Sequence, residues 1–216
     1  MSVGRREVTG TGRLPSTLVA GLGRLARPAP VDEAVEKCEV CGQNLSEEHR
    51  HLLEMSERRI LCTCEPCIAM KSGLENYVPV GTRFLWLDDF VFSDELWAAF
   101  QLPVGLAFFM RSTGTGTVVA LYPSPAGATE CELHLESWEA LVAANPILDD
   151  LEADGEALVV NRMGDGVREH AIVPIDECYR LVGLIKSTWQ GISGGTAIED
   201  AVPKFFEYVR HRAGVA

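Results

Sequence analysis

ALVVNRMGDGVREHAIVP, residues 157–174, holds the clearest strand pattern in this chain. Its two apolar runs, 157–163 and 167–173, predict β-strands, because β-branched residues are frequent in both. Gly164-Asp-Gly166 between them predicts a tight turn, since glycine reaches backbone conformations that other residues avoid. The stretch therefore predicts an antiparallel hairpin that ends at Pro174.

The same plan of strand, glycine turn, strand and helix occurs twice along the chain. The first copy pairs Val104–Met110 with Val118–Tyr122 around Ser112–Gly116, and a helix containing Trp138 follows. The helix after the second copy carries an apolar stripe at helical spacing: Cys178, Leu181, Val182, Ile185 and Trp189. We therefore predict an α+β fold in which an antiparallel sheet has helices on one face.

Five of the seven cysteines lie ahead of this region, within residues 38–67. They form Cys38-x-x-Cys41-Gly42 and Cys62-x-Cys64-x-x-Cys67, with His49-Arg-His51 between them. Two Cys-x-x-Cys pairs supply four thiolates, which suit one tetrahedral ion, usually zinc. A hairpin over residues 49–65 would bring the two pairs together. The sequence thus predicts that a small zinc-ribbon-like metal segment precedes the sheet.

The ligand set of this segment is open, because it holds more donors than one ion needs. The candidate ligands are Cys38, Cys41, Cys64, Cys67, Cys62 and His51. Cys62 and His51 are surplus to four thiolates, and we expect them to be substitutes or to contact the ligands. A closed structural zinc site is the first hypothesis, and an iron–sulfur cluster is the alternative. Disulfides are the weakest hypothesis, since the cysteine count is odd and we expect a reducing compartment.

Composition divides the chain into three predicted parts. Residues 1–35 hold five arginines among Gly, Ser, Thr and Pro, which predicts a disordered arm. Residues 36–72 form the predicted Cys/His ribbon, and residues 73–216 form the α+β domain. An apolar run near Leu18 is short and interrupted by arginine, so we do not expect an export signal.

Charge and hydropathy exclude two classes of partner. The net charge of −12 argues against unspecific nucleic-acid binding, which needs a basic surface. No run approaches the roughly 20 apolar residues that span a bilayer, so no membrane partner is expected. Together these features predict a cytoplasmic protein.

We find no convincing catalytic motif and expect a protein that is not an enzyme. Gly191-Ile-Ser193-Gly-Gly195 has the letters of a hydrolase nucleophile elbow, but a helix precedes it where a strand is required. Thr113-Gly-Thr-Gly-Thr117 leads into a strand, so it predicts a hairpin turn and not a phosphate loop. Cys131 and His134 are two isolated candidate metal ligands.

Several motifs taken together resemble an uncharacterised actinobacterial domain family. They are Cys38-x-x-Cys41, Glu48-His-Arg-His51-Leu-Leu, Cys62-x-Cys64-x-x-Cys67, Leu121-Tyr-Pro-Ser-Pro-Ala-Gly-Ala-Thr-Glu130, Cys178-Tyr-Arg-Leu-Val-Gly-Leu-Ile185 and Trp189-x-Gly-x-Ser-Gly-Gly195. Members of that family tend to be encoded beside uptake nickel–iron hydrogenase genes. The resemblance implies an accessory role in maturation, assembly or electron transfer, with a hydrogenase subunit or maturation factor as the protein partner.

Overall fold

The computed structural model of the protein describes residues 35–124, 126–131, 133–188 and 196–214. The predicted arm, residues 1–35, lies outside these ranges except for Val35. From Glu36 onward the chain belongs to one compact unit. None of the helices in the described ranges has the length and apolar character needed to cross a membrane.

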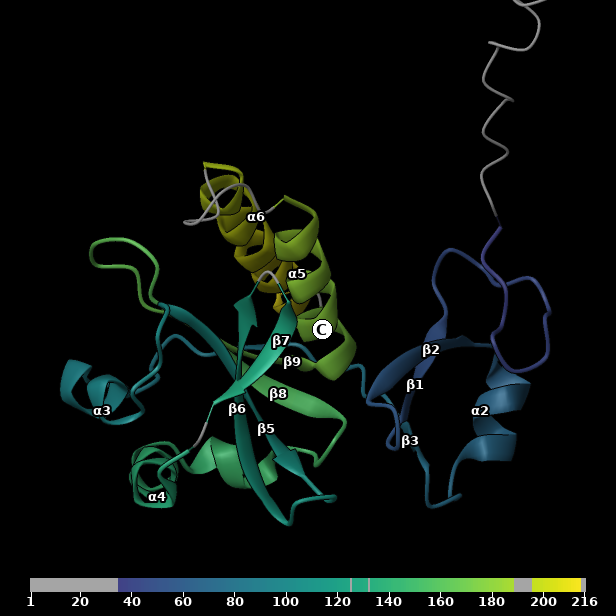
Figure 1. Ribbon diagram of the computed structural model, residues 1–216, viewed down its shortest axis with the longest axis horizontal. Coiled ribbons are helices and arrows are strands. Elements are labelled where there is room, and N and C mark those ends of the chain that lie inside the picture. The colour runs from purple at the N-terminus through teal and green to yellow at the C-terminus, as the bar shows by residue number, and fades with distance from the viewer. Residues whose placement is uncertain (1–34, 125, 132, 189–195, 215–216) are drawn as a thin grey trace, which may run out of the picture. The chain divides into compact units, whose positions relative to one another are not determined.

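A six-stranded antiparallel sheet forms the centre of this unit (Figure 1). Its strands are β4 (Leu85–Trp86), β5 (Leu106–Ser112), β6 (Thr117–Ser124), β7 (Gly127–Cys131), β8 (Glu156–Asn161) and β9 (Glu169–Pro174). The strand order is β4-β9-β8-β5-β6-β7. Both predicted hairpins are confirmed, because β5 pairs with β6 and β8 pairs with β9 in antiparallel register.

Helices cover both faces of this sheet. The helices are α3 (Asp94–Ala99), α4 (Leu135–Ala144), α5 (Ile175–Thr188) and α6 (Thr196–Ala213), and a 3₁₀ helix η1 spans Pro146–Asp150. Phe108 and Val159 pack with α5 and α6 in one core. Phe109 and Leu158, one residue along each strand, pack with α3, α4 and η1 in a second core.

The α+β class and the antiparallel sheet are therefore confirmed. The expected helices on one face correspond to α5 and α6, and the opposite face carries α3, α4 and η1 as well. The reason is visible in β8, where all six residues are buried. A strand that lacks a polar face needs a cover on both sides.

A three-stranded sheet precedes the large one. It consists of β1 (Arg50–Glu54), β2 (Arg59–Thr63) and β3 (Tyr77–Pro79) in the order β2-β1-β3. Helix α2 (Glu65–Lys71) lies between β2 and β3 in the chain. Among the residues that the structure describes, its own core consists of Leu52, Leu61 and Ile68, with Tyr77 packed against them. The hairpin predicted over residues 49–65 is confirmed, and it returns the second cysteine pair toward the first.

Candidate metal centre

Four cysteine sulfurs converge where the small sheet meets helix α2. The Sγ atoms of Cys38, Cys41, Cys64 and Cys67 all lie within 4.8 Å of one another. Cys41 Sγ and Cys64 Sγ are 3.7 Å apart. Zinc–sulfur bonds of about 2.3 Å in a tetrahedron place neighbouring sulfurs about 3.8 Å apart. The four sulfurs therefore lie at a spacing that a single metal ion can bridge after small side-chain movements.

Local backbone geometry positions each cysteine pair. Gly42 has a φ of +78° and donates its N–H to Cys38 O over 2.8 Å, which closes a tight turn around the first pair. Few residues other than glycine adopt this conformation without strain. The second pair begins α2, where Cys64 O accepts the N–H of Cys67 over 3.0 Å. A turn and a helix start thus point two sulfurs each toward a common centre.

The four thiols differ in acidity. Burial raises the pKa of Cys38, but the backbone N–H groups of Cys64, Cys41 and Val40 outweigh it and lower the pKa to about 6. Burial and, after it, hydrogen bonds with the neighbouring thiols together raise the pKa of Cys67 to about 12. One thiolate therefore forms readily, and each further thiolate is opposed by the charge already present. A cation at the centre would remove this opposition, because metal binding displaces thiol protons.

The two surplus candidate ligands lie in a separate group of donors. His51 and Cys62 face each other directly across the β1–β2 pair. With His49, which precedes β1, they bring three donor atoms within 4.8 Å of one another. His51 and Cys62 are among the candidate ligands predicted from the sequence, whereas His49 is not. The His49-Arg-His51 spacing could have indicated it, because residues two apart in an extended segment point to the same face.

The other sequence candidates do not form donor groups within the described ranges. Cys131 lies on β7, and His134 precedes α4 with its Nε2 atom 3.4 Å from Gln101 Nε2. Neither belongs to a group of three or more metal-binding side chains in the part of the chain that the structure describes. Cys178 lies on α5 and is fully buried against the core, as its place on an apolar stripe indicates. The Gly191–Gly195 motif lies outside the described residues.

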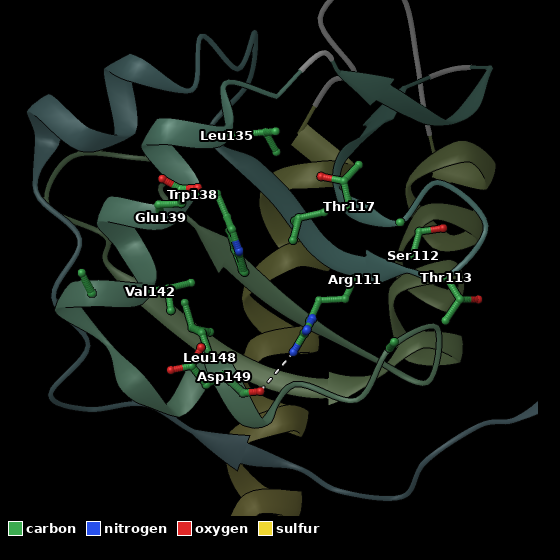
Figure 2. Close-up of a pocket in the computed structure, with 14 residues that line it drawn as sticks. Arg111, Ser112, Thr113, Thr117, Leu135, Trp138, Glu139, Val142, Leu148 and Asp149 are labelled. Carbon is green, nitrogen blue, oxygen red and sulfur yellow. Dashed lines mark hydrogen bonds between the residues drawn. The ribbon is translucent and has the colours of Figure 1, made fainter.

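A cavity of about 700 Å³ lies between α4, η1 and the β5–β6 hairpin (Figure 2). Leu135, Trp138 and Val142 line one side, while Arg111 donates a hydrogen bond to Asp149 O over 3.1 Å on the other. Thr113–Thr117 joins β5 to β6 at the rim, which confirms that this segment is a hairpin turn. Neither cysteine nor histidine is among the lining residues, so this cavity offers no soft metal ligand.

Comparison with known proteins places the chain in a family without assigning an activity. Searches of curated proteins and of solved structures both give no match. One family model matches residues 37–213, a range that contains both sheets and every candidate ligand. The chain therefore belongs to the family of unknown function called DUF5947.

Proposed function

We propose that this protein is a non-enzymatic zinc-binding accessory protein. Cys38, Cys41, Cys64 and Cys67 hold one structural zinc ion, and the α+β domain supplies surfaces for protein–protein contacts. The observation that carries the proposal is the convergence of four thiols, from two segments, within 4.8 Å. Four thiolates fill a tetrahedral zinc ion and leave no position for a substrate, which is typical of structural sites.

The small sheet is the part of the fold that a structural ion would stabilise. Its own apolar core holds three buried side chains, Leu52, Leu61 and Ile68. So small a core buries little area to offset the entropy of ordering the segment. An ion that links the turn at Cys38 to the start of α2 would stabilise the segment directly, because metal binding free energy becomes folding free energy.

The proposed partner is a component of a nickel–iron hydrogenase, either a subunit or a maturation factor. Support comes from the motif resemblance described above and from the net charge of −12, which favours a partner with a basic surface. The alternative function is iron–sulfur redox or metal-handling chemistry at the same cysteines. It is favoured by the donor type, because thiolates also bind iron–sulfur clusters.

Metal analysis of the protein purified without oxygen tests the site. We expect zinc bound to the four thiolates and no visible charge-transfer absorption. Cys38→Ser should lose that zinc, whereas Cys131→Ser, outside both donor groups, should retain it. A brown protein that contains iron would replace this proposal with the iron–sulfur alternative. Co-purification from the native host tests the partner, and absence of hydrogenase components would reject the partner assignment while leaving the zinc site untouched.

A further inference from the structure

We propose that His49, His51 and Cys62 bind a second metal ion, a divalent transition metal such as zinc, separate from the tetrathiolate ion. One ring nitrogen of each histidine and the cysteine Sγ lie within 4.8 Å of one another. The two imidazole rings meet edge to face with centroids 4.8 Å apart. Imidazole and thiolate are the donors that zinc and its neighbours in the first transition row prefer.

His49 supplies the most specific observation. Its side chain is only 8% exposed, and its Nδ1 lies 3.0 Å from Ser46 O and 3.6 Å from Glu36 Oε2. Nδ1 therefore carries the proton, which leaves a lone pair on Nε2. That Nε2 atom is buried and has no hydrogen-bond partner among the described residues. A buried polar atom without a partner costs free energy, and a metal ion would satisfy it.

His51 is oriented in the same way by a residue far along the chain. Its Nδ1 lies 2.7 Å from Oδ2 of Asp176, in the first turn of α5. A carboxylate on one ring nitrogen fixes the tautomer and leaves the other nitrogen free to bind a metal. This pairing is the usual second contact of metal-binding histidines in proteins. Asp176 is thus a positioning residue for the proposed ion.

The surroundings of Cys62 favour a cation. The carboxylates of Glu36, Glu39 and Asp176 place negative charge near its thiol. The Glu39 carboxylate also accepts the backbone N–H of Cys62 over 2.8 Å, which keeps this charge close to the sulfur. A divalent ion at the three donors would offset this acidic charge.

The proposed ion would have an open coordination position. Three protein donors form the group in the part of the chain that the structure describes, one fewer than a closed tetrahedral site requires. Both histidines line a cleft of about 410 Å³, together with Glu177, Tyr208 and Arg212. Water, or a donor atom from a bound molecule, would complete the coordination from this cleft. The site is therefore suited to an exchangeable ion, whereas the tetrathiolate site is closed.

Zinc stoichiometry of the full chain tests the second site. The protein is stripped with a chelator under reducing conditions, loaded with Zn²⁺ alone, and measured by native mass spectrometry. We expect two ions per wild-type chain and one in His49→Ala and in Cys62→Ser. The matched controls His134→Ala and Cys131→Ser should keep two. Asp176→Asn should bind both ions but hold the second about 10- to 100-fold more weakly, measured by competition with a zinc indicator.

Each other outcome rejects the second site in a recognisable way. One ion in the wild type that persists in His49→Ala and Cys62→Ser means that the three donors bind no metal. Loss of every ion in Cys62→Ser means that Cys62 is a ligand of the tetrathiolate ion. If His49→Ala does not fold, Cys62→Ser decides the question. Because Cys38→Ser removes only the first ion, failure of the proposed zinc function is distinguishable from failure of this inference.

Discussion

At the scale of single residues, His170 is a buried base close to two arginines. It is 5% exposed, and its ring lies against Phe90 with the centroids 4.9 Å apart. Burial and, after it, the positive charges of Arg162 and Arg168 together lower its pKa to about 4. The imidazole is therefore neutral in the folded protein at pH values where it is protonated in the unfolded chain.

This difference predicts an acid-sensitive stability. Between pH about 6.5 and 4 the unfolded state binds a proton that the folded state does not, so the free energy of unfolding falls as the pH falls. We expect this one group to cost about 2 to 3 kcal/mol by pH 4.5. His170→Phe should remove that loss, since Nε2 of His170 has no hydrogen-bond partner in the described part of the chain. Urea unfolding at several pH values checks this, and parallel curves for the two proteins would contradict it.

At the scale of elements, the small sheet and the large sheet differ in the interactions that stabilise them. The large sheet lies between two extensive apolar cores. The small sheet encloses three buried apolar side chains and adjoins both donor groups. Leu53 on β1 and Val80 after β3 are buried in the core beneath α5 and α6, and Met55, Ile60 and Val78 pack against that core half-buried.

Metal removal should therefore loosen one part of the fold selectively. With a chelator present, we expect β1, β2 and α2 to lose most of their protection from amide hydrogen exchange. β5, β8 and β9 should keep theirs, because none of the four metal-centre cysteines belongs to the two cores that bury them. Hydrogen exchange followed by mass spectrometry, with and without chelator, measures both regions at once. Equal loss in all strands, or no loss in β1 and β2, would show that the ion does not stabilise the small sheet.

At the scale of the whole molecule, an ion pair joins the segment after β3 to the start of β8. Arg83 Nε and Nη2 donate to the two oxygens of Glu156 over 2.8 and 2.6 Å. The Glu156 side chain is 4% exposed and also accepts the N–H of Glu152 over 3.1 Å. Two parallel hydrogen bonds to a buried carboxylate make a strong pair.

Arg83→Met should lower the free energy of unfolding by about 3 kcal/mol, because it leaves the Glu156 carboxylate buried and unpaired. Arg58→Met is the matched control, since it breaks the Arg58–Glu130 pair in which both side chains are about half exposed. An exposed pair contributes about 1 kcal/mol or less. Urea denaturation compares the two variants. Equal losses would mean that burial of Glu156 does not matter.

Local sequence patterns were sufficient for the two central hairpins of this fold, whereas strand β7 and helix α2 were not predicted. Apolar runs and glycine turns identify both hairpins of the large sheet, because strand formation and turn geometry depend on neighbouring residues. Cysteine spacing likewise indicated the four sulfurs that the structure brings together. That these sulfurs bind zinc stays a prediction.

The tertiary structure alone decided which face each helix covers and which side chains meet across long distances in sequence. Helices α3 and α4 lie on the second face because the central strands are apolar on both sides. That apolar pattern does not indicate which helix covers which face of the sheet. Asp176 reaches His51 from 125 residues away, a contact that no local pattern contains. The periodicity of apolar residues indicates whether a side chain is buried, whereas the packing of the whole chain determines which side chain it contacts.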